Sequence, residues 1–131
     1  HRDLRGEGEA AGVSPGGTDT GDGGRPAGSS AARLMFTGTL LLDVLLPHDS
    51  RSLKAKRAYV RPVVAALRRL EVAVAEVGGV DLHGRAEIGV ASVSGDAGHL
   101  REVLDACERL VAARPELELL SVRRRLHSID D

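Results

Sequence analysis

Positively charged side chains recur along residues 51–68 at spacings that place them on one side of a helix. The set consists of Arg51, Lys54, Arg57, Arg61 and Arg68, and no acidic residue lies between Ser50 and Leu70. At about 100° per residue the last four share one arc. Such a face is suited to contacts with RNA phosphates, which would give a strongly salt-dependent affinity. The alternative is a solvated helix face, although exposed faces usually mix both signs of charge.

Lys56 differs from these residues because it falls at the centre of the apolar arc of the same predicted helix. Its aliphatic stem could cover the core while the ammonium group reaches water. The ammonium group could instead pair with a carboxylate of the sheet, and the candidates are Glu76 and Glu87. Lys56 is therefore a candidate both for nucleic-acid binding and for a structural ion pair.

Three consecutive arginines, Arg123 to Arg125, end the last apolar run of the chain. Because side chains alternate along a strand, Arg123 and Arg125 should share one face while Arg124 takes the other. These charges could protect a sheet edge against strand addition. If Arg123 and Arg125 face the open side of the sheet, they could instead extend an RNA-binding surface.

Residues able to perform catalysis or bind metal are few. Four of them surround one predicted hairpin: Glu76, Asp81, His83 and Glu87. They could bring carboxylates near an imidazole, but their spacing matches no metal signature, and solvated loop residues are the alternative. Residues 94–96 lack the length and the lysine of a phosphate-binding loop. We therefore predict no catalytic residue, no metal site, no cofactor and no enzymatic activity.

The composition predicts one domain with an aliphatic core. The chain has 131 residues, 42% of them hydrophobic, and its only aromatic residues are Phe36 and Tyr59. The formal net charge of −1 provides no overall field to attract nucleic acid, so any such binding must use a local patch. The lone Cys107 cannot form an internal disulfide, which fits the cytoplasm, and we expect it on a helix face in the core. No run approaches the ~20 apolar residues of a membrane span, so we expect no membrane partner.

Residues 1–34 are dominated by Gly, Ser, Ala, Pro, Asp and Glu. Such a segment cannot bury enough apolar surface to offset the entropy of ordering, so it is predicted to be disordered. Met35 opens the first strand-like run, which suggests that the preceding residues are a wrongly assigned start; a genuine flexible tail is the alternative.

The rest of the chain predicts a folded domain at 35–126 and a frayed tail at 127–131. Strands are expected at 36–46, 71–78, 85–94 and 116–125, with one helix after Ser52 and another after Asp96. The apolar face of the first helix comprises Leu53, Val60, Val63, Val64 and Leu67. Pro62 lies inside this helix and should kink it near residues 58–61 or break it.

The order β-α-β-β-α-β predicts an α+β, ferredoxin-like sandwich, with a four-stranded antiparallel sheet and two helices on one face. RNA-recognition motifs of this fold stack bases on aromatic residues of the open face. The corresponding positions here hold no aromatic residue; they are Thr37, Thr39, Leu41, Arg85, Gly89 and Ala91. Small and aliphatic side chains suit packing against protein, so a homodimer through the open face is a second hypothesis.

Three stretches together resemble the bacterial YlxP-like family, a domain of unknown function. They are Ser52-Leu53-Lys54-Ala55-Lys56-Arg57, Val74-Ala75-Glu76-Val77-Gly78, and Arg85-Ala86-Glu87-Ile88-Gly89-Val90 followed by Ser94-Gly95-Asp96. The resemblance covers residues 35–125 and implies a ferredoxin-like fold. The family is commonly encoded beside translation and ribosome-maturation genes, which implies RNA or ribosome association, and it supplies no catalytic residues. The chain departs from it at Pro62, and at His83, where an aromatic residue is common.

Residues and resemblance together predict a non-enzymatic cytoplasmic binding module that contacts RNA or the ribosome through its first helix. The alternative is a homodimeric interaction or regulatory module that uses the open sheet face.

Overall fold

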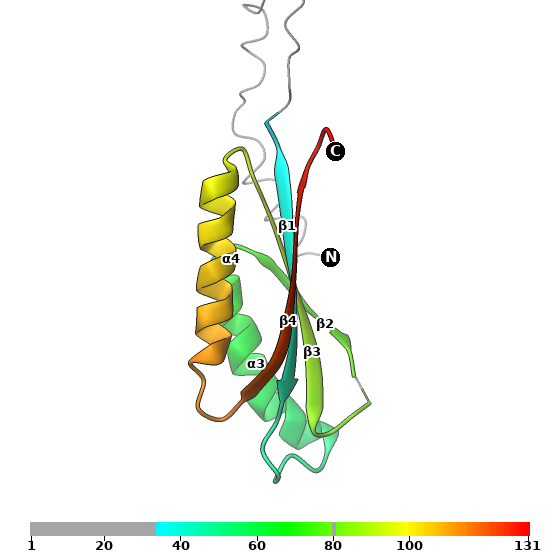
Figure 1. The fold of residues 1–131 in the computed structure, drawn as a ribbon. Helices are drawn as coiled ribbons and strands as arrows, with labels where there is room; N and C mark the ends of the chain where they lie inside the picture. Colours follow the sequence, from blue (N-terminus) through cyan, green and yellow to red (C-terminus); the bar gives the residue numbers. More distant parts are fainter. Residues whose placement is uncertain (1–33, 80) are drawn as a thin grey trace, which may run out of the picture.

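The computed structural model describes residues 34–79 and 81–131. Their elements are β1 (Phe36–Leu45), α3 (Leu53–Arg68), β2 (Ala73–Gly78), β3 (Arg85–Ser94), α4 (Ala97–Ala112) and β4 (Glu118–Ser128). Both helices lie against the same side of the sheet (Figure 1). The predicted disordered extension at 1–34 lies outside the described residues except for Leu34, whose side chain is exposed.

The four strands form one sheet in the order β2-β3-β1-β4, and every neighbouring pair is antiparallel. This topology, with two helices on one face, confirms the predicted ferredoxin-like fold. β1 and β3 are the central strands, while β2 and β4 form the two edges. No described helix is long and apolar enough to cross a membrane.

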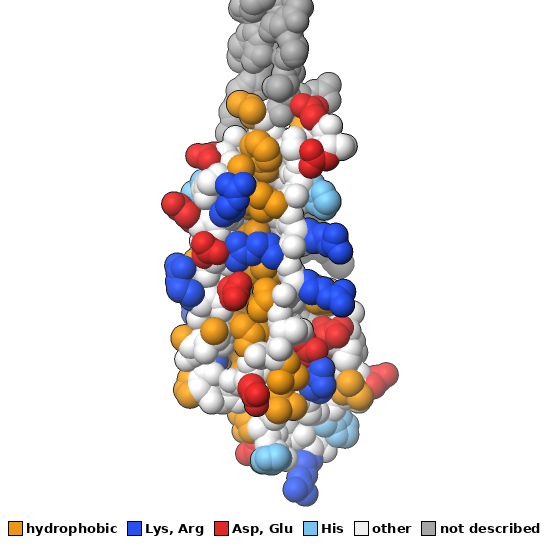
Figure 2. All heavy atoms as spheres, viewed as in Figure 1, with side chains coloured by type: hydrophobic (Ala, Val, Ile, Leu, Met, Phe, Trp, Pro, Cys, Tyr) orange, Lys and Arg blue, Asp and Glu red, His pale blue; other side chains and the backbone are white. Residues whose placement is uncertain are grey.

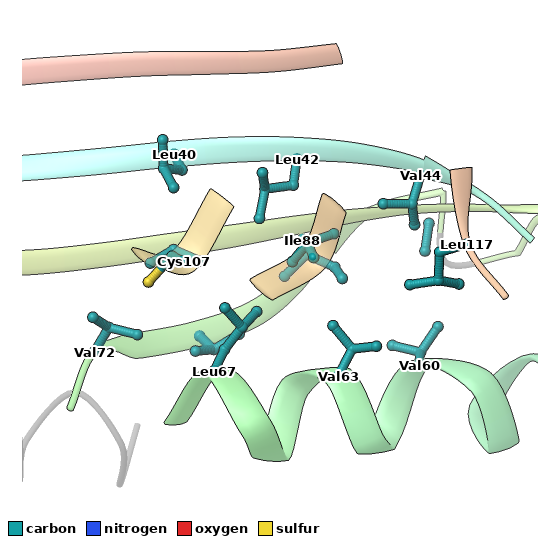
Figure 3. Close-up of a cluster of buried hydrophobic side chains, with 14 of the residues drawn as sticks. Leu40, Leu42, Val44, Val60, Val63, Leu67, Val72, Ile88, Cys107 and Leu117 are labelled. Carbon is teal, nitrogen blue, oxygen red and sulfur yellow. The ribbon is translucent and has the colours of Figure 1, made fainter. Parts of the chain in front are cut away.

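The core lies between the sheet and the helices and is aliphatic, as the composition predicts. Figure 3 shows Leu40, Leu42 and Ile88 of the sheet facing Val63 and Leu67 of α3. All five are almost fully buried because alternate positions of the strands and one face of the helix point into the same layer.

Cys107 occupies the predicted place on the core face of α4, with none of its surface exposed. Burial raises the pKa of its thiol to about 11, and this rise is opposed by the nearby positive charge of Arg124. A thiol with so high a pKa is protonated and unreactive at neutral pH.

β1 packs closely against α4 at Gly38, on the helix-facing side of the sheet. A Cβ atom placed on Gly38 would lie 2.7 Å from Leu104 Cδ1 and 3.2 Å from Leu100 Cδ2. The missing side chain therefore sets how closely α4 can approach the sheet.

Ser52 is the N-cap of α3, and its hydroxyl accepts a hydrogen bond from the Ala55 N–H (3.0 Å). The helix runs without interruption through Pro62, so the predicted break is wrong. Proline has no backbone N–H, so the carbonyl of Ala58 has no helical hydrogen-bond partner at Pro62. Both residues are exposed, and this carbonyl can therefore bond water instead. Leu53 is 40% exposed rather than in the core as predicted, because it lies at the first position of the helix.

Two strands begin later and one ends later than predicted. β2 starts at Ala73 and β4 at Glu118, and a left-handed residue, Glu71 (φ 65°), precedes β2. β4 continues to Ser128, which lies opposite Phe36, so the predicted frayed tail at 127–131 is wrong for its first two residues. β4 continues through polar residues at its C-terminal end, because one side of an edge strand faces water and needs no apolar side chains.

Candidate nucleic-acid interface

α3 presents a cationic surface, which we define as Lys54, Arg57 and Arg61. All three residues are exposed, and the helix contains no acidic residue. Within the described part of the chain, no carboxylate lies at ion-pair distance from any of the three. Their positive charge therefore remains available to an external anion.

Two further arginines flank this surface. Arg51 is exposed just before the helix, and its Nε donates a hydrogen bond to the carbonyl of His48 (3.3 Å). That bond still leaves the other guanidinium N–H groups of Arg51 accessible to a ligand. Arg68 is exposed at the C-terminal end of α3, where its charge also complements the helix dipole.

Lys56 does not belong to the interface, although it was a nucleic-acid-binding candidate. The residue is 2% exposed, and its Nζ donates to the carbonyl oxygens of Gly79 (2.6 Å) and Leu82 (2.9 Å). The same Nζ lies 2.7 Å from Glu76 Oε2. The lysine is thus paired with Glu76, the first of its two predicted partners, and an RNA phosphate cannot reach it.

The contact with Glu76 is an ion pair rather than a well-formed hydrogen bond. Glu76 Oε2 is buried, and it accepts no hydrogen bond of good geometry from the described residues. The two short bonds to loop carbonyls therefore fix the position of the ammonium group, and the carboxylate balances its charge. Together they fasten the loop after β2 to the first turn of α3.

The three C-terminal arginines alternate across the sheet as predicted. Arg124 lies opposite the buried Leu40, on the helix side, where its Nη2 pairs with Asp105 (2.9 Å) and Glu108 (3.3 Å) of α4. Arg123 and Arg125 are exposed opposite Leu41 and Thr39, on the open face.

Arg123 and Arg125 face the open side of the sheet, which is the condition stated for an RNA-binding role, but they are not continuous with the cationic surface of α3. α3 packs on one side of the sheet, whereas these two arginines project from the other, so the sheet separates the two groups of charges. The molecule therefore has two separate basic patches.

The polar residues of the β2–β3 hairpin do not gather into one site. Glu76 lies opposite Ile88 on the helix side, whereas Glu87 lies opposite Asp43 on the open face. His83 is exposed, and its carbonyl accepts a hydrogen bond from Ser50 Oγ (2.6 Å). In residues 34–79 and 81–131, no three His, Cys, Asp or Glu side chains are arranged to bind a metal ion.

The open face of the two central strands has no aromatic side chain for stacking bases. Phe36 is half-buried and packs on the helix side of β1. A Cβ atom placed on Gly89 of β3 would lie 3.0 Å from Val77 Cγ1. The side chain of Val77, from the neighbouring β2, therefore covers this glycine. Val77 is 55% exposed and forms, with the half-buried Leu41, an apolar part of this face.

An ion pair borders this apolar part. Arg85 binds both carboxylate oxygens of Asp43, at 3.2 Å from Nε and 2.7 Å from Nη2. The hydrogen bond and the charge of Asp43 raise the pKa of Arg85 above its usual value. Arg85 is therefore already neutralised and contributes little to binding an external anion.

Sequence reasoning did not predict a structural role for Tyr59, the second aromatic residue of the chain. The Tyr59 hydroxyl donates a 2.7 Å hydrogen bond to Asp49 Oδ1, which ties α3 to the turn before it. The hydrogen bond to Asp49 raises the pKa of Tyr59, since a phenol that donates to a carboxylate resists ionisation. The only signal was a tyrosine ten positions after an aspartate in a predicted turn.

Fold and surface together define a ferredoxin-like α+β domain that has a basic helix. Its central strands carry no aromatic side chains on the open face on which bases could stack. The chain belongs to the family described as a protein of unknown function (DUF503), whose model matches residues 37–124. This is the YlxP-like family that the sequence resembles. None of the curated proteins compared with the chain matches it.

Proposed function

We propose that the domain is a non-enzymatic module that binds structured RNA, including ribosomal RNA, through the cationic surface of α3. The observation that supports the proposal is the availability of Lys54, Arg57 and Arg61, which are exposed and lack a carboxylate partner among the described residues. An unpaired cation interacts with phosphate more strongly than one whose charge a neighbour already neutralises.

The shape of this surface favours backbone contact over reading of bases. Cations at successive turns of a helix follow a line about 5 Å apart, comparable to the spacing of phosphates along a strand. The central strands offer no aromatic ring for stacking, so sequence-specific recognition on the sheet is not part of the proposal. The family resemblance supports RNA as the polyanion.

The test is a binding measurement with a labelled RNA hairpin at low and moderate salt. The variant Arg57→Glu/Arg61→Glu should lose at least about tenfold in affinity, whereas Arg101→Glu/Arg109→Glu changes charge equally on the exposed side of α4 and should lose much less. Circular dichroism would verify that both variants remain folded. Equal losses in the two variants would show only a response to net charge and would contradict a site on α3.

A second candidate is self-association through the open face. The observation that favours it is the exposure of Val77, whose apolar side chain is 55% exposed. It covers Gly89 of β3, which pairs with Leu41 of β1. Removing such a patch from water would stabilise a dimer. Light scattering at high concentration tests it: a dimer that Val77→Lys disrupts would support it, and a monomer would exclude it.

A further inference from the structure

β4 is a long edge strand whose outer side carries no strand in the described part of the chain. The Ile129 N–H bonds to the Met35 carbonyl (2.9 Å), so odd-numbered backbone groups of this segment point toward β1. Backbone groups alternate in direction along a strand, and the N–H and C=O of Val122, Arg124 and Leu126 therefore point outward. These groups are the hydrogen-bonding partners that an added strand would use.

The two sides of this edge differ in chemistry. On the open face, Arg123 and Arg125 are exposed, and neither has a carboxylate at ion-pair distance among the described residues. On the helix side, β4 carries half-buried apolar residues, and Arg124 between two of them pairs with Asp105 and Glu108 of α4. The apolar residues are Leu119, Val122 and Leu126.

These apolar residues are only half covered because α4 packs chiefly over β1 and β3. Figure 2 shows a hydrophobic stripe along this edge of the molecule, where β4 supplies these half-buried side chains. A fifth strand beside β4 would cover that stripe with every second side chain and would place the remaining side chains next to the two arginines.

We propose that the outer edge of β4 binds an extended segment of a partner protein in which acidic and apolar residues alternate. Opposite residues on paired strands have Cβ atoms about 4.5–5.5 Å apart, so acidic side chains would meet Arg123 and Arg125 directly. The apolar side chains would pack on Val122 and Leu126, on either side of the ion pairs that Arg124 makes with α4. Backbone hydrogen bonds supply affinity in this mode, and the alternation of side chains supplies specificity.

A second copy of β4 fits this edge poorly. The three arginines occupy the middle of the strand, so a two-fold antiparallel pairing centred on any of them places that arginine opposite itself. Like charges directly opposite one another destabilise a strand pair. Arg124 is already neutralised by Asp105 and Glu108, whereas no carboxylate of residues 34–79 or 81–131 pairs with Arg123 or Arg125, which favours an acidic partner.

The test uses a fluorescently labelled peptide as long as β4, in which Glu and Val alternate, and measures anisotropy against the full chain. We expect saturable binding that weakens by about tenfold or more in Arg123→Glu/Arg125→Glu. A peptide in which Lys replaces Glu should prefer that variant to the wild type. A peptide of the same composition with Glu and Val in separate blocks should not bind.

Three results would overturn the proposal: no binding of the alternating peptide, equal binding of the block peptide, or equal binding by the folded arginine variant. The first would favour the simpler role of the arginines, protection of a bare edge. Arg57→Glu/Arg61→Glu serves as a control, since these residues lie across the sheet from Arg123 and Arg125, and it should retain the affinity for the peptide. Peptide binding and RNA binding can therefore fail independently.

Discussion

Lys56 Nζ lies 2.7 Å from Glu76 Oε2, in a position where the lysine is 2% exposed. The same ammonium group also bonds the carbonyls of Gly79 and Leu82. Burying a charge is costly unless a counter-charge and hydrogen bonds replace its water, and here both are present. The pair joins α3, the end of β2 and the following loop into one unit.

Lys56→Met should destabilise the domain by about 2–4 kcal/mol, because it leaves a partly buried carboxylate and two loop carbonyls without their partner. Glu76→Gln should cost less, since the lysine keeps both carbonyl bonds. Urea unfolding of the two variants checks the order. A Lys56→Met variant as stable as the wild type would contradict the role assigned to this lysine.

Gly38→Ala should destabilise the domain by about 1–3 kcal/mol, since the new methyl group would press on Leu104 and Leu100 of α4. Gly84→Ala is the matched control because a Cβ atom there meets nothing within 4 Å. Thermal unfolding of the two variants measures the difference. Equal melting temperatures would show that α4 moves away from β1 at little cost.

Burial of Cys107 predicts a loss of stability in alkaline solution. The pKa of the thiol rises from its ordinary value of 9.0 to about 11 on folding, so the folded state holds this proton more tightly than the unfolded state. The resulting stabilisation is complete below pH 9.0 and is lost as the pH rises to about 11.

The measurement compares urea midpoints of the wild type and Cys107→Ala across this alkaline range. Other groups titrate there as well, so the informative quantity is the difference between the two proteins. The wild type should lose more stability with rising pH than the variant does. Parallel profiles would show that the thiol ionises as easily in the folded chain as in the unfolded one.

The RNA proposal predicts a specific salt dependence. The slope of log affinity against log salt is about −0.9 for each phosphate neutralised on a duplex. Arg61→Gln should therefore make the slope shallower by about 0.9, and Arg109→Gln on α4 should leave it unchanged. A slope that Arg61→Gln does not alter would exclude Arg61 from contact with phosphate.

Much of the fold follows from local patterns. The apolar alternation of Leu40, Leu42 and Val44 and the helical spacing of Val60, Val63 and Leu67 are short-range features, and the structure has all six residues in the core. The end of β4 was missed because His127 and Ser128 are polar, and an edge strand needs no apolar pattern to continue.

The site was predicted in part, for the same reason. The cationic surface belongs to one helix, so helical periodicity was enough to find it. The role of Lys56 depends on backbone carbonyls at Gly79 and Leu82, which no side-chain pattern reveals. The separation of Arg123 from Arg57 depends on long-range pairing of β4 with β1, which only the structure provides.

Under the two proposals, that separation would let the domain act as an adaptor. The sheet separates the cationic side chains of α3 from those of β4. A ligand bound to either group would therefore leave the other group accessible. Ligands on the two patches would then be held at once, without displacing each other, and a single small domain would tether a nucleic acid to an acidic protein strand.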